Sequence, residues 1–295
     1  MSELILSILE QTFIYAIMSL GVYISYQILN FPDLSIDGSF PFGAAVTAVL
    51  ILKGVNPILT LLIVLVLGSL IGLITGLIHV RLKVSDLLSG ILVMTALYSV
   101  NLRIAGTSNL PLFGEKTIFN NALVESFPAF LKPYATLLIV FVLIVVIKLA
   151  LDMYLKTKSG FLLRAVGDNP TLVTSLAKNP DKVKIFGLML GNALVAVSGG
   201  VLCQYQRFFE ITMGQGKMVM GLASVIIGMS VFAKLSKLKG TTTAILGMLI
   251  YQIAIAGAIK LGLQSGDLKL ITSILFLVAL VINRKDIFTG RKKHA

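Results

Sequence analysis

Long apolar runs, interrupted by short polar segments, dominate this chain. Most of the runs approach the ~20 residues that an α-helix needs to cross the hydrocarbon core of a bilayer. Nine apolar spans are predicted, at Leu4 to Leu29, Phe40 to Leu52, Pro57 to Val80, Leu87 to Ile104, Pro133 to Leu155, Val183 to Gln204, Met218 to Ala233, Thr241 to Leu261 and Leu268 to Asn283. The pattern therefore predicts an all-α polytopic membrane protein with about nine (8 to 10) transmembrane helices, forming one transmembrane domain over residues 1–295.

Composition and charge agree with this class. Of the 295 residues, 57% are hydrophobic and 13% are charged, and the net charge is +12. Most of the Lys and Arg residues fall in the loops that alternate spans place on one side, whereas the first 52 residues contain none. Because cytoplasmic loops of membrane proteins are enriched in Lys and Arg, we expect a cytoplasmic carboxyl end and an external amino end. The basic charge then reflects orientation in the cell membrane, and we expect no nucleic-acid partner.

The two halves of the chain show a weak internal repeat. A shift of 178 residues superposes Gly21 on Gly199, Phe31 on Phe209, Gly38 on Gly216, Gly43 on Gly221 and Ala45 on Ala223. The assigned topology puts residues 30–39 near the inner side and residues 205–217 near the outer side. This opposition predicts an inverted repeat, with halves of about 1–155 and 183–283, and broken helices between them, as in many transport paths.

The stretch "NFPDLSIDGSF" (residues 30–40) breaks the apolar pattern between the first two spans. Pro32, Gly38 and Pro41 disfavour a continuous helix. Irregular backbone at membrane depth is tolerated only beside protein or water, so we expect this segment to line a cavity. The equivalent stretch in the second half is "RFFEITMGQGK". The predicted translocation path comprises Asn30, Phe31, Asp33, Asp37, Gly43, Phe209, Glu210 and Gly221.

Simpler roles exist for some of these residues. Asp37 or Ser39 suits the N-cap of a helix that begins at Phe40 or Pro41, and capping does not exclude a place on the path. Gly43 and Gly221 are expected to let two helices approach beside the path, so that Gly43→Leu abolishes uptake but not membrane insertion.

A polar segment on the cytoplasmic side, residues 156–182, predicts a short docking helix. Asp168 or Asn169 is its N-cap, with Pro170 in the first turn, and Asn179 before a proline ends it after about nine residues. One face of this helix is apolar, with Leu172, Val173, Leu176 and Ala177. Such a helix could dock a soluble motor protein, or it could simply lie on the lipid surface.

The segment "GFLLRAVGDNPTLVTSLAKN" resembles the coupling segment of permease subunits of ABC importers of the branched-chain amino-acid and ribose class. The matching positions are Gly160, Arg164, Ala165, Gly167, Asn169 and Asn179. The stretches "ILNFPDLSIDGSFPFGAAV" and "MVMGLASVIIGMSVF" extend the resemblance over nearly the whole chain, and the first is closest to permeases described as taking up tryptophan or other aromatic amino acids. In "GMSVFAKLSKLKG" lysines replace glycines that are usual in the class.

The resemblance implies a bacterial homodimeric permease, two copies of an ABC ATPase, and an extracytoplasmic substrate-binding protein. ATP and Mg would bind the ATPase, since this chain has no "GxxxxGK[ST]" phosphate loop. Its docking contacts would come from Gly160, Arg164, Ala165, Gly167, Asn169, Pro170, Leu172, Val173, Leu176 and Asn179. No catalytic residue, cofactor or metal is expected in the chain.

An ion-coupled secondary transporter is the alternative. It would also use an inverted repeat and broken helices, but it normally places carboxylates deep in the membrane. Here Asp33, Asp37 and Glu210 fall at predicted span ends. A membrane enzyme or metalloprotein is disfavoured, because Cys203, His79 and His294 form no recognisable set.

Overall fold

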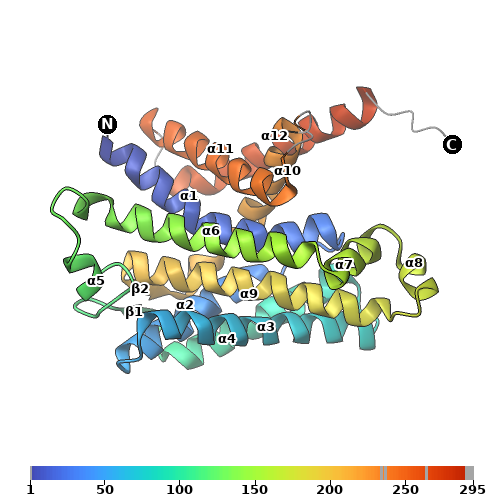
Figure 1. Ribbon diagram of the computed structural model, residues 1–295, viewed down its shortest axis with the longest axis horizontal. Helices are drawn as coiled ribbons and strands as arrows, with labels where there is room; N and C mark the ends of the chain where they lie inside the picture. Colours follow the sequence, from blue (N-terminus) through green and yellow to red (C-terminus); the bar gives the residue numbers. More distant parts are fainter. Residues whose placement is uncertain (1, 233–234, 236–237, 263–264, 290–295) are drawn as a thin grey trace.

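The computed structural model describes residues 2–232, 235, 238–262 and 265–289. Most of the long helices lie side by side in an elongated bundle (Figure 1). A small β-sheet lies at one end of the bundle and the short helices α7 and α8 lie at the other, and we call these the sheet end and the α8 end. The predicted span end at Ala233, and also His294, fall outside the described residues.

The first part of the chain forms four long helices. They are α1 (Ser2–Val22), which continues as the π-helical segment η1 (Tyr23–Ile28), α2 (Ile36–Leu52), α3 (Pro57–Arg81) and α4 (Asp86–Ala105). Local chemistry sets several boundaries: Asn56 caps α3 ahead of a proline, Ser85 caps α4, and Gly106 ends α4 in a left-handed conformation.

The middle of the chain contains the short elements. They are β1 (Asn109–Pro111), α5 (Ala122–Glu125), η2 (Lys132–Tyr134), the long α6 (Ala135–Leu155), α7 (Lys158–Asp168) and α8 (Pro170–Ser175). The last part comprises α9 (Pro180–Gln206), β2 (Phe208–Glu210), η3 (Ile211–Gly214), α10 (Lys217–Val231), α11 (Gly240–Lys260), η4 (Ser265–Asp267) and α12 (Leu268–Thr289). Strands β1 and β2 pair antiparallel, with Leu110 opposite Phe209.

Seven helical segments among the described residues are long and apolar enough to cross a membrane. Two shorter apolar helices, Ile36–Leu52 and Leu268–Val281, complete the set. The structure thus confirms the prediction of an all-α polytopic membrane protein, with α2 as a short helix rather than a full span.

Helix α9 forms the centre of the bundle and packs against α1, α2 and α3. Its neighbours approach through glycines: a methyl group at Gly43 of α2 would overlap the Ala196 carbonyl, and one at Gly72 of α3 would overlap the Leu188 carbonyl. Small residues allow this close backbone contact, which is a main source of helix association in lipid. In contrast, α6 is largely exposed along its length, as expected for a helix that faces lipid.

Candidate translocation site

The amino-terminal ends of two broken helices meet at a partly exposed point of the bundle. Helix α2 begins at Ile36 after an irregular stretch, and α10 begins at Lys217 after η3. The carboxylate of Asp37 in the first turn of α2 accepts hydrogen bonds from the backbone N–H groups of Gly216 (2.9 Å) and Met218 (2.7 Å). A carboxylate at this point satisfies free N–H groups and complements the positive end of the α10 dipole.

This arrangement corrects the expected role of Asp37 and Ser39. Helix α2 begins at Ile36, with Ser35 at the N-cap and no side-chain cap, so Pro41 lies inside the helix. Pro41 has no N–H to bond the carbonyl of Asp37, and that carbonyl packs closely against Gly214 instead. Asp37 therefore caps the helix opposite and not its own, because the free N–H groups of α10 lie within reach.

Asp33 anchors the irregular stretch between η1 and α2. Its carboxylate is buried and accepts from the Ser35 backbone N–H (2.9 Å) and from Asn192 Nδ2 of α9 (2.7 Å). Asn192 Oδ1 in turn accepts from the hydroxyls of Ser35 (3.1 Å) and Ser39 (2.5 Å). The network satisfies the polar groups that a broken helix leaves in an apolar environment.

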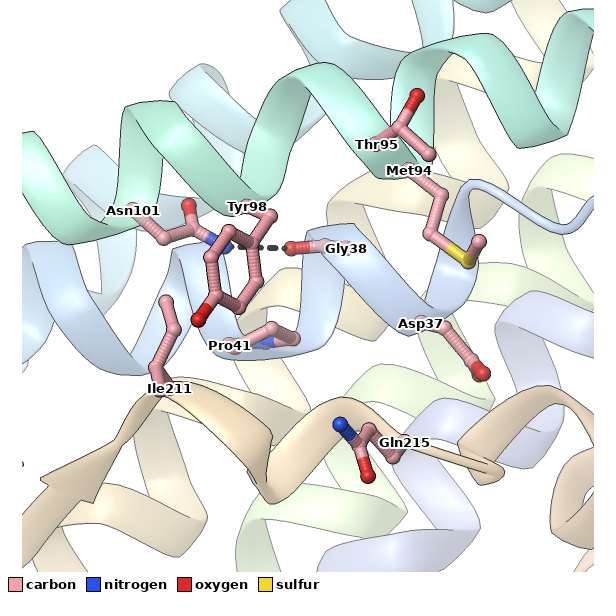
Figure 2. Close-up of a pocket in the computed structure, with 9 residues that line it drawn as sticks. All are labelled: Asp37, Gly38, Pro41, Met94, Thr95, Tyr98, Asn101, Ile211 and Gln215. Carbon is pink, nitrogen blue, oxygen red and sulfur yellow. Dashed lines mark hydrogen bonds between the residues drawn. The ribbon is translucent and has the colours of Figure 1, made fainter. Parts of the chain in front are cut away.

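Beside Asp37 lies a cavity of about 440 Å³. Figure 2 shows its lining from α2, α4 and the η3 region: Asp37, Gly38, Pro41, Met94, Thr95, Tyr98, Asn101, Ile211 and Gln215. Asn101 Nδ2 donates to the Gly38 carbonyl (3.1 Å) and ties α4 to the start of α2. A mainly apolar lining with a few polar groups is typical of sites for small organic molecules.

Lys217 supplies positive charge next to this site. Its Nζ donates to the Tyr15 hydroxyl (3.1 Å) and lies 4.3 Å from the centroid of the Tyr15 ring. A cation over an aromatic ring is favourable, more so in a desolvated setting. Within the described residues Asp37 has no ion pair, so backbone N–H groups are its direct partners.

Four other predicted path residues lie away from the cavity. Asn30 has a left-handed backbone (φ 56°), and the buried Phe31 next to it makes an edge contact with His79, 5.0 Å between ring centroids. Phe209 and Glu210 belong to β2 at the sheet end, where Phe209 is buried and Glu210 accepts from the Thr212 hydroxyl. The structure thus brings Asp37 to the cavity and leaves these four outside its lining.

Gly43 and Gly221 do not face each other. Gly43 of α2 packs on α9 at Ala196, whereas Gly221 of α10 packs on Val22 and Met18 of α1. Each broken helix is therefore in close contact with the first long helix of the other half of the chain. The expected close approach of helices is present, but it involves two separate pairs.

The predicted docking residues gather at the α8 end. Asn169 caps α8 by accepting from Thr171 N–H (3.1 Å), as predicted, and Pro170 follows it. The helix has six residues and not nine, because the backbone turns left-handed at Ala177 (φ 53°). Asn179 accepts from the N–H groups of Asp181 (2.9 Å) and Lys182 (3.3 Å), so it caps α9 and does not end α8.

The apolar side chains of α8 divide into buried and exposed ones. Val173 is fully buried, whereas Leu172 is 50% exposed and Leu176 is 56% exposed. In α7, Gly160 packs against Leu155 and Gly167 packs against the Ile28 carbonyl, which fixes α7 to the ends of α6 and η1. Ala165 is partly buried against the core, and Arg164 lines a second cavity.

Sequence reasoning missed two groups of residues. Asn192 carried a signal, since a lone asparagine inside an apolar span requires a polar partner. The α4 residues that line the cavity, including Tyr98 and Met94, carried none, because they look like ordinary span residues.

The fold and the site together define a class, that of helical membrane permeases with discontinuous helices beside a cavity. The family model for the permease component of branched-chain amino acid transport systems matches residues 4–282. The chain belongs to this family, and it is a transmembrane subunit of an ABC importer.

The chain is similar to several known permeases. It is 42% identical to a tyrosine transport system permease protein of Clostridioides difficile, over 96% of this chain and 92% of the relative. It is 28% identical to a probable branched-chain amino acid transport permease, LivH, of Methanocaldococcus jannaschii, over 70% and 68% of the two chains. It is 25% identical to the ribose import permease RbsC of Escherichia coli K12, over 95% and 85%. No solved structure matches the chain significantly.

Proposed function

We propose that two copies of this chain form the path of an ATP-driven importer of aromatic amino acids, with tyrosine and tryptophan as the candidates. An external binding protein delivers the solute at the sheet end, and two ABC ATPase subunits, which carry ATP and Mg, dock at the α8 end. The amino terminus lies outside the cell and the carboxyl terminus lies in the cytoplasm.

The observation that carries the proposal is the junction at Asp37. Two helices start there from opposite halves of the chain and are linked by hydrogen bonds from Gly216 and Met218 to one carboxylate. Broken helices that meet beside a cavity are the usual construction of a membrane transport site. A small shift of α10 relative to α2 changes this junction, which couples the path to movements elsewhere in the chain.

Exposed leucines on α8 support docking of the ATPase at this end. Leu172 and Leu176 are about half exposed on a helix that buries Val173 and contacts α7 and α9. Apolar side chains of this kind, on a short and firmly anchored helix, are suited to a groove in a partner protein.

The choice of solute is supported by the cavity and by one relative. The cavity of about 440 Å³ is in the range of small-molecule sites, and Tyr98, Met94 and Pro41 offer flat or polarisable apolar surface to an aromatic ring. The relative from Clostridioides difficile is a tyrosine transport permease.

Uptake into proteoliposomes tests the function. The chain is reconstituted with its ATPase and binding protein, and uptake of labelled tyrosine, tryptophan, leucine and ribose is measured with and without ATP. We expect ATP-dependent uptake of tyrosine or tryptophan and little of the others. Preference for leucine or ribose would reject the solute class, and uptake driven by an ion gradient without ATP would reject the importer.

A pair of substitutions tests the docking surface. We expect Leu172→Asp with Leu176→Asp to abolish co-purification of the ATPase while the permease still inserts and unfolds at its normal temperature. Leu82→Asp is the control, because Leu82 is 69% exposed in the turn after α3 and outside the predicted docking segment. Equal loss of the ATPase in the control, or no loss in the pair, would contradict docking at α8.

A further inference from the structure

A second cavity, of about 480 Å³, lies between α6, α7, η1 and the start of α11. Most of its lining residues are polar or charged, and the lining comprises Tyr23, Asp152, Leu155, Lys156, Arg164, Lys239, Gly240 and Thr241. It is separate from the Asp37 cavity and shares no residue with it.

The charges around this cavity do not balance. Asp152 already accepts from Lys148 and Lys239, each at 2.8 Å, and from the Thr241 hydroxyl at 2.6 Å. This one carboxylate is fully engaged by two lysines, and Lys156 and Arg164 have no carboxylate partner among the residues that the structure describes. The cavity therefore carries excess positive charge.

The start of α11 adds hydrogen-bond donors, whose partial charge is also positive. Lys239 is the N-cap residue of α11, but its side chain makes no capping hydrogen bond. Gly240 and Thr241 occupy the first two helical positions. N–H groups at these positions have no acceptor within their own helix. The 21-residue α11 also directs the positive end of its dipole into this cavity.

Tyr23 supplies an independent indication of a ligand. The residue is only 9% exposed and lines the cavity; no hydrogen bond of the described residues involves its hydroxyl, which is not one of the fully buried unpaired polar atoms and so reaches the open space of the cavity. The hydroxyl packs so closely on Gly240 that any side chain at Gly240 would overlap it. A phenol whose ring is buried and whose hydroxyl meets a basic cavity without a protein partner is available as a donor to an anion.

We propose that this cavity binds a phosphate group. Arg164 and Lys156 would neutralise its charge, and the Tyr23 hydroxyl and the first N–H groups of α11 would donate to its oxygens. The cavity lies where the apolar α6 segment ends, at Leu155 and Lys156, so in a bilayer that α6 spans it would lie near the headgroups. Basic pockets between helices at this depth suit anionic headgroups, although a free phosphate offers the same chemistry.

Lipid binding to the purified full chain tests the proposal. The chain is titrated with phosphatidylglycerol or phosphatidylcholine, and bound lipid is counted by native mass spectrometry. We expect one phosphatidylglycerol whose affinity falls about tenfold in Lys156→Gln and in Arg164→Gln, and about threefold in Tyr23→Phe, which keeps the ring against Gly240. Arg81→Gln, exposed at the last residue of α3 and outside the cavity, is the matched control and leaves the affinity unchanged.

A second arm separates the two sources of phosphate. Inorganic phosphate is added at constant ionic strength, and thermal unfolding and displacement of phosphatidylglycerol are followed. If inorganic phosphate raises the unfolding temperature of the lipid-free chain, and the three variants lose this effect, the cavity is a free-phosphate site. If phosphate only displaces bound phosphatidylglycerol and does not stabilise the lipid-free chain, the cavity is a headgroup site. Lipid and phosphate affinities that are unchanged in the three variants would overturn the proposal.

Discussion

At the residue scale, the path depends on carboxylates whose partners are far away in the sequence. Asp37 belongs to α2, yet it caps α10, about 180 residues further on. Local reading of "SIDGSFPFG" identified a capping residue correctly but assigned it to the wrong helix, because the position of α10 is set by packing of the whole chain. By contrast, Asn169 and Pro170 begin α8 as predicted, since their partners are only two residues away.

Removing the Asp37 carboxylate tests this cap. We expect Asp37→Ala to lower the free energy of unfolding by about 1–2 kcal/mol and to reduce uptake, because two N–H groups of α10 lose their acceptor. Asp37→Asn, which keeps one acceptor oxygen, should lie between Asp37→Ala and the wild type in denaturant unfolding. Asn56→Ala removes the exposed cap of α3 and should lower stability by about 1 kcal/mol without loss of uptake. If Asp37→Ala were as stable as the wild type, the Asp37 carboxylate would not cap α10.

A double-mutant cycle tests the buried network around Asp33. Removal of Asn192 leaves the buried Asp33 carboxylate without one donor, which typically costs about 1–3 kcal/mol. Once Asp33 is gone, the loss of Asn192 should matter less, so we expect a coupling energy of about 0.5–3 kcal/mol between Asp33→Ala and Asn192→Ala. Strictly additive effects on unfolding would show that the two side chains act independently.

At the element scale, helix positions were readable from hydropathy and helix ends were less so. The predicted spans agree with the helices within a few residues over most of the chain. Helix α2 begins four residues earlier than predicted, because Pro41 is tolerated inside the helix. Helix α8 ends early at Ser175, because the backbone of Ala177 is left-handed. An alanine in the sequence does not indicate a left-handed conformation.

Glycine packing between α2 and α9 gives a prediction at this scale. A methyl group at Gly43 would overlap the backbone of Ala196, so we expect Gly43→Ala to destabilise the fold by about 1–3 kcal/mol, and the larger Gly43→Leu to impair folding as well as uptake. Gly257→Ala in α11 is the control, since nothing lies within 4 Å of the added methyl group, and it should be neutral or slightly stabilising. Thermal unfolding in detergent measures both; equal stability of the two variants would contradict close packing at Gly43.

At the scale of the whole molecule, one packing contact recurs in the two halves of the predicted inverted repeat, whose opposite orientation stays a prediction. Gly43 packs on Ala196. The shift of 178 residues relates Gly43 to Gly221 and Met18 to Ala196, and Gly221 and Met18 are also in contact. Sequence comparison alone could suggest the pairs but not the contacts between them. Helix α6 lies on the exposed surface of the bundle against α1, and α7 and α8 follow it at the α8 end.

The central claim is that solute passes the junction of α2 and α10, and thiol labelling in the assembled transporter tests it most directly. Gln215→Cys in the cavity and Leu261→Cys, 86% exposed at the end of α11, are compared in a chain whose buried Cys203 is replaced by alanine. We predict that a membrane-impermeant reagent labels position 215 at a rate that changes when ATP binds and falls when aromatic solute is present, whereas position 261 responds to neither. A labelling rate at position 215 that is indifferent to ATP and solute would contradict the account.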